Sequence, residues 1–122
     1  TNKGYAQINR TWQENDAVSL SLDFEPRLVR SNAKVRYNMR KSCVFREPLL
    51  YCMESVDNGP YLNQILIKED QKFQVLNDDH LFKGCISLSG NIKRFTNSTD
   101  NLYSTSKPKL NDSKVKLIPY FL

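Results

Sequence analysis

The chain has 122 residues, of which 39% are hydrophobic and 25% are charged, so it is long enough for one domain with its own core. No stretch approaches the roughly 20 apolar residues that a membrane-spanning helix needs, and the sequence predicts no membrane partner. The net charge of +5 would suit nucleic acid. However, the lysines and arginines stand singly or alternate with apolar residues, which is typical of solvated strand faces and predicts no nucleic-acid partner.

The two ends of the chain suggest a piece of a larger protein. The sequence begins with Thr1 and not with a methionine, and the last residues, Leu117–Leu122, are largely apolar. The first residues lack the pattern of a signal peptide. An odd number of cysteines, Cys43, Cys52 and Cys85, favours small buried thiols over a disulfide framework. We therefore expect a cytoplasmic protein, with a native N-terminus upstream of Thr1.

The first 25 residues predict a hairpin. Residues alternate over Tyr5–Trp12, and Val18–Phe24 places apolar side chains at every second position. A polar turn at Glu14–Asp16 separates the two segments, and Pro26 ends the second one.

A continuous apolar run, Leu49–Met53, follows Cys43–Phe45 and a break at Pro48. Such a run indicates a central strand that is buried on both faces. Within it we expect Leu50 and Cys52 to be buried, with Tyr51 on the opposite face.

The rest of the chain predicts further short strands separated by turn formers. They fall at 64–67, 72–76, 84–88, 92–95 and 115–121, and the polar stretch 96–113 reads as a long surface loop. Many short strands with little helical periodicity favour an all-β fold, an antiparallel β-sandwich of jelly-roll or Greek-key type spanning residues 1–122. The last strand should leave an open apolar edge, through which the chain would self-associate.

Candidates for chemistry are few. The cysteine spacing gives no CxxC pair that would begin a zinc site, and His80 follows two aspartates in a turn-like sequence that predicts an exposed loop. Glu47 and Glu54 are seven apart, which puts them roughly 20 Å apart on opposite faces of an extended strand. They cannot serve as the acid and nucleophile of one glycosidase site. We predict no catalytic residue, no metal ligand and no cofactor in this chain.

Trp12 and Tyr5 are the remaining candidates for binding. Aromatic rings can stack on the apolar face of a sugar, so these two residues are the predicted glycan contacts if the chain is a carbohydrate-binding module. Packing in a core or between domains is the alternative, and it is favoured.

Three stretches together resemble the C-terminal region of glycoside hydrolase family 127, the β-L-arabinofuranosidase-like enzymes. The first includes Gly4, Tyr5, Ile8, Arg10, Trp12 and Asp16, the second is Pro26–Arg36, and the third is Phe45–Asn58 with Pro48, Tyr51, Cys52 and Glu54. The terminal Leu117–Tyr120 is also similar to a family segment.

The resemblance implies a bacterial glycoside hydrolase in which an (α/α)6-barrel catalytic domain precedes β-sandwich domains. The family's glutamate acid/base and zinc-bound cysteine nucleophile belong to the barrel, and no residue of this chain matches those motifs. Cys52 matches a cysteine of the sandwich instead. The chain would then be a non-catalytic accessory domain whose partner is its own catalytic domain. Glu47 stands where the family usually has glycine, which puts the tight turn before Pro48 in question.

Overall fold

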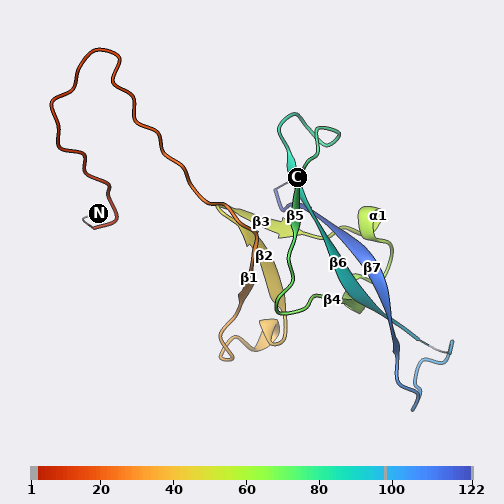
Figure 1. Cartoon of the computed structure of the whole chain (residues 1–122). Coiled ribbons are helices and arrows are strands. Elements are labelled where there is room, and N and C mark those ends of the chain that lie inside the picture. Colours follow the sequence, from red (N-terminus) through yellow and green to blue (C-terminus); the bar gives the residue numbers. More distant parts are fainter. Residues whose placement is uncertain (1–2, 98, 122) are drawn as a thin grey trace.

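The computed structural model describes residues 3–97 and 99–121 and is built from antiparallel strands with very little helix (Figure 1). The strands are β1 (Arg27–Arg30), β2 (Ser42–Arg46), β3 (Leu49–Cys52), β4 (Ile65–Leu66), β5 (Gln74–Asn77), β6 (Ile86–Thr96) and β7 (Lys109–Pro119). One α-helical turn, α1 (Ser55–Asn58), and two 3-10 turns, η1 (Arg36–Asn38) and η2 (Leu62–Gln64), connect them. None of the described helices is long and apolar enough to cross a bilayer. The predicted all-β, antiparallel fold class is confirmed, and the sheet is not closed into a barrel.

The long hairpin of β6 and β7 organises the sheet. The strand order is β1-β2-β3-β7-β6-β4, and β5 also pairs with β6. β6 and β7 pair from Leu88↔Leu117 to Thr96↔Lys109, whereas β3 meets β7 only at Tyr51↔Pro119 and Cys52↔Ile118. The small sheet β1–β3 is therefore joined to the hairpin at one end of β7.

Both parts of the sheet contribute to one core. Its buried residues are Val44, Tyr51, Phe73, Leu88, Ile92, Val115 and Leu117. Within each strand these residues follow the period of two that puts alternate side chains on one face. The Tyr51 hydroxyl donates a hydrogen bond to the Ile86 carbonyl at 3.1 Å and so ties β3 to the start of β6.

The expected orientation of β3 is wrong. Leu50 is 38% exposed and Tyr51 only 4%, while Cys52 is half-buried. The register pairs Tyr51 with buried Val44, so Tyr51 faces the core and Leu50 the other side. A continuous apolar run does not show which alternate set faces the core, and a one-residue choice reverses every side chain.

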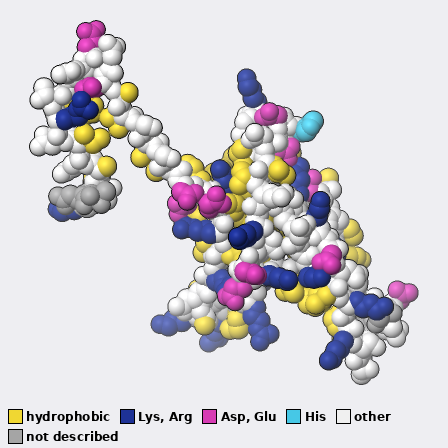
Figure 2. All heavy atoms as spheres, viewed as in Figure 1, with side chains coloured by type: hydrophobic (Ala, Val, Ile, Leu, Met, Phe, Trp, Pro, Cys, Tyr) yellow, Lys and Arg dark blue, Asp and Glu magenta, His cyan; other side chains and the backbone are white. Residues whose placement is uncertain are grey.

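The predicted N-terminal hairpin does not form. Apart from one isolated bridge at Tyr5, residues 3–25 have no strand structure, and Val18, Leu20 and Leu22 are exposed. The segment runs away from the sheet (Figure 1), and hydrophobic side chains lie on its surface (Figure 2). Alternation gives a strand only where a partner strand accepts its hydrogen bonds, and no described part of this chain does so for residues 18–24.

The loop predicted at 96–113 is shorter in the structure, because both of its ends belong to strands. Thr96 closes β6, and Lys109–Ser113 belongs to β7, because these polar residues pair with β6 through the backbone. A β-ladder needs only backbone groups, so a polar sequence can extend a strand beyond its apolar part.

The end of β7 is not the open edge that the sequence suggested. Leu117 pairs with β6 and Ile118 with β3, and the Tyr120 amide continues by donating to the Leu50 carbonyl at 2.8 Å. Ile118 is 5% exposed, although Tyr120 and Phe121 remain on the surface. Self-association through this strand stays a prediction, without an unpaired edge to support it.

Candidate functional site

The two predicted glycan contacts lie in the segment that precedes β1. Tyr5 and Trp12 are exposed, and the Arg10 guanidinium lies 5.4 Å from the centre of the Trp12 ring. Arg10 also pairs with Asp16 at 3.0 Å, and the Asp16 carboxylate accepts a bond from the Gln13 amide. The indole is therefore held beside a cation in a local turn, away from the sheet.

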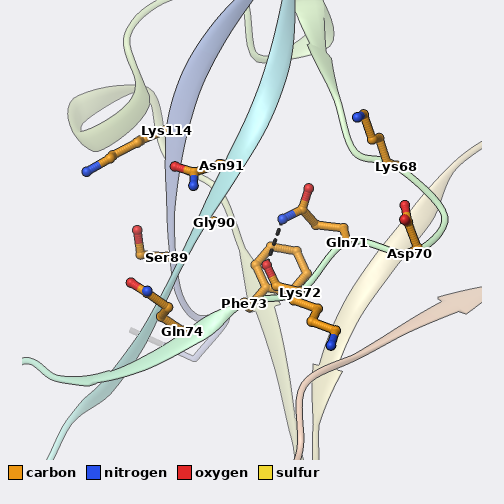
Figure 3. A pocket seen from close by; sticks show the side chains of 10 residues that line it. All are labelled: Lys68, Asp70, Gln71, Lys72, Phe73, Gln74, Ser89, Gly90, Asn91 and Lys114. Atoms are coloured by element: carbon orange, nitrogen blue, oxygen red, sulfur yellow. Dashed lines mark hydrogen bonds between the residues drawn. The ribbon is translucent and has the colours of Figure 1, made fainter.

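An open cavity of ≈ 750 Å³ lies along β6 (Figure 3). Amide and hydroxyl side chains line much of it, and Lys68 and Lys114 lie at its two sides. The other lining residues are Asp70, Gln71, Lys72, Phe73, Gln74, Ser89, Gly90 and Asn91. Groups of this kind can bind the hydroxyls of a sugar.

Gly90 shapes the floor of this cavity. A Cβ added there would lie 3.0 Å from Cδ1 of Phe73 and 3.1 Å from Nε2 of Gln71, so the missing side chain lets the Phe73 ring pack against β6. Glycine within a strand often marks such a close approach.

We expect Gly90→Val to destabilise the domain by about 1–3 kcal/mol, because the new side chain must displace Phe73 from the core. Chemical denaturation would measure it. Gly90→Val should cost less in a Phe73→Ala background; an equal cost in both backgrounds would show that this contact does not decide the effect.

Asn58, at the end of α1, is the centre of a polar cluster. Its side chain bonds both backbone groups of Lys116: Nδ2 donates to the carbonyl at 2.9 Å, and Oδ1 accepts from the amide at 2.8 Å. Nδ2 also donates to the Glu54 carbonyl, and the Arg94 guanidinium donates to the Asn58 carbonyl at 2.5 Å. Asn58 thus takes the place of a neighbouring strand beside β7 and fixes α1 to it.

The Lys116 amine joins two carboxylates in the same cluster. It lies 2.8 Å from Asp78 and 3.5 Å from Asp57, and Asp78 is buried. The hydrogen bond from Lys116 lowers the pKa of Asp78, assisted by the Ser87 hydroxyl, and the same pairing raises the pKa of Lys116. Nothing in the sequence indicated this cluster, since its members come from α1, from the residue that follows β5 and from β7.

The Asp78 carboxylate should make the stability of the fold decrease at low pH. A carboxyl whose pKa is lowered by folding stabilises the native state above its unfolded pKa, and this contribution disappears as pH falls through the folded value. We expect the stability difference between the chain and its Asp78→Asn variant to be constant from about pH 5 to 7 and to shrink below about pH 4. Urea titrations across this range would measure it. A difference that stays unchanged at low pH would contradict the assignment.

The other candidates remain apart. His80 is exposed, as predicted, and Glu47 forms an ion pair with Arg27. The tight turn at Glu47 and Pro48 forms with a cis peptide bond, despite the absence of glycine. Of the three free thiols only Cys85 is fully buried, so the prediction of buried cysteines is wrong for Cys43, which is exposed. Over residues 3–97 and 99–121, no three His, Cys, Asp or Glu side chains come together as a metal site.

Comparison with known proteins gives consistent results. Residues 26–122 match the family model of the glycoside hydrolase family 127 C-terminal domain. A non-reducing end β-L-arabinofuranosidase of Bifidobacterium longum subsp. longum is 44% identical over 41 residues, which are 34% of this chain and 6% of that protein.

Solved structures of glycoside hydrolases are also similar to this chain. A family 127 β-L-arabinofuranosidase from Geobacillus stearothermophilus T6 has 29% identity and a TM-score of 0.76, covering 81% of this chain and 16% of that one. A structure described as a glycoside hydrolase has 26% identity and a TM-score of 0.80, covering 93% and 19%. This chain thus spans less than a fifth of the relatives it matches. It belongs to glycoside hydrolase family 127, as a C-terminal domain.

Proposed function

We propose that this chain is a non-catalytic accessory domain of a longer cytoplasmic glycoside hydrolase that acts on β-L-arabinofuranosides. Its role is to support the catalytic domain. The family resemblance implies that this catalytic domain is an (α/α)6 barrel. The relatives named as β-L-arabinofuranosidases, and the small share of their length that this chain covers, support the proposal.

The pairing of Asp57 and Asp78 with Lys116 carries the proposal. A retaining glycosidase also brings two carboxyl groups together, but one of them must hold a proton and so needs a raised pKa. Here the lysine favours the charged carboxylate and lowers the pKa of Asp78. The Asp78 carboxylate is therefore poorly suited to protonate a leaving group.

Hydrolysis by the isolated chain tests this proposal. We expect no turnover of a chromogenic β-L-arabinofuranoside by the purified chain, with or without added zinc. Turnover that Asp78→Asn abolishes while the variant stays folded would overturn the proposal.

The polar cavity along β6 favours a second function, an independent carbohydrate-binding module. Its amide and hydroxyl lining suits saccharide hydroxyls, while Trp12 and Tyr5 would provide stacking surfaces elsewhere. Titration of the chain with arabino-oligosaccharides separates the two functions. Saturable binding lost in Asn91→Ala would support the cavity, and loss in Trp12→Ala would support the N-terminal segment. The accessory role predicts no saturable binding.

A further inference from the structure

The small sheet β1–β3 has a second apolar face, opposite the core. Val29 pairs with Cys43, Phe45 pairs with Leu50, and Cys52 continues the row along β3. Val29 is 41% and Leu50 38% exposed, Cys43 is exposed, and Phe45 and Cys52 are half-buried. These five residues are called the outer face below.

The two halves of the sheet differ in what they present on the side away from the core. Along the middle of β6 and β7 the corresponding positions are polar, for example Ser89, Asn91 and Lys114, whereas Leu88, Ile92 and Val115 are buried on the other face. Ile118, which pairs with Cys52 at the end of β7, is apolar and is buried within the chain. An antiparallel sheet usually turns one polar face to water, and strands that are apolar on both faces are usually covered on both. Within the described chain, Val29, Cys43 and Leu50 of the outer face therefore lack a cover, whereas Phe45 and Cys52 are partly covered.

We propose that the outer face is the surface on which the preceding domain of the longer protein docks. This inference rests on the accessory role proposed above and adds the location of the contact.

The connection to the preceding domain enters beside this surface. Residues 3–25 lead directly into β1, which supplies Val29, and this segment contributes no strand that covers the outer face (Figure 1). Arg27 and Glu47 pair at its rim, and the Arg27 guanidinium lies 5.7 Å from the centre of the Phe45 ring. An apolar centre with a charged rim is typical of an interface.

The small size of the outer face favours a tethered domain over a second copy. It offers five side chains, whereas a stable complex between free proteins involves about 20–30 residues on each side. A tethered partner needs fewer contacts, because the linker supplies a high effective concentration. Interfaces between domains of one chain are correspondingly modest in size.

The native thiols provide a direct test. Cys43 lies exposed on the outer face, and Cys85 is 1% exposed in the core. The reactivity of Cys43 therefore reports whether the outer face is covered, and the reactivity of Cys85 reports unfolding. Cys52 is less suitable, because burial and then Glu54 raise the pKa of its thiol. A Thr105→Cys variant adds a control thiol in the exposed connection between β6 and β7.

The experiment compares alkylation by N-ethylmaleimide in the isolated chain and in the full-length protein, with each site followed by peptide mass spectrometry. We expect Cys43 to react at least about tenfold more slowly in the full-length protein, with no change at position 105. A Leu50→Lys substitution in the full-length protein should restore much of the Cys43 reactivity while Cys85 stays protected.

Equal rates at Cys43 in both proteins would overturn the inference. Protection that appears in the isolated chain as its concentration rises would also overturn it, by assigning the face to a second copy. Both results leave the accessory role standing, because that role is tested by hydrolysis; turnover by the isolated chain would remove it whatever the alkylation rates.

Discussion

Replacing Leu88 with alanine is expected to lower the free energy of unfolding by about 2–5 kcal/mol. Leu88 is 0% exposed and lies in the core beside Leu117, its partner on β7. Truncation removes buried apolar surface and leaves a cavity that the long β6–β7 hairpin cannot easily close. Urea denaturation followed by circular dichroism measures the loss.

Leu50→Ala is the matched control, since it makes the same chemical change on the opposite face of the sheet. Leu50 is 38% exposed, so we expect a loss below about 1 kcal/mol in the isolated chain. A larger loss for Leu50 than for Leu88 would mean that the core lies on the other face of β3.

Replacing Asn58 with alanine is expected to cost about 2–4 kcal/mol, because it leaves the amide and carbonyl of Lys116 without partners, at about 1–3 kcal/mol for each buried group. The same change removes the bond that Asn58 donates to the Glu54 carbonyl and so loosens α1. Thermal and urea unfolding would both report the effect.

Two further variants test whether the effect is specific to the side-chain amide of Asn58. Asn58→Asp retains an acceptor for the Lys116 amide but removes the donor to its carbonyl, so it should also destabilise. Asn63→Ala, at an exposed position, should change little. Equal effects at positions 58 and 63 would contradict the role of Asn58 as the link between α1 and β7.

The sequence predicted the fold class well and the faces of the strands less well. The run around Leu49–Met53 correctly indicated a strand next to the core, and its continuous apolar character predicted burial on both faces. Only the face with Tyr51 is buried within the described chain. Tyrosine at a core position was unexpected because its hydroxyl needs a partner, which the Ile86 carbonyl, 35 residues away in the sequence, provides.

Long-range pairing explains the other differences. Periodicity identified Val18–Phe24 as strand-like, but periodicity says nothing about whether a partner strand is present. Likewise, Asp78 and Lys116 stand far apart in sequence beside unremarkable neighbours, and only the pairing of β5, β6 and β7 brings them together. Asp57 and Asn58 lie in a stretch that resembles the family, but the resemblance did not indicate their contacts with β7.

The most direct test of the central claim, that the carboxylates of this domain stabilise and do not catalyse, is the kcat of the full-length protein with Asp78→Asn, measured on a chromogenic β-L-arabinofuranoside at a temperature where both proteins are folded. We predict a kcat within about twofold of the unsubstituted protein, because an accessory carboxylate contributes nothing to proton transfer. A fall of about 10²-fold or more in a folded variant, the loss expected for a general acid or base, would contradict the account.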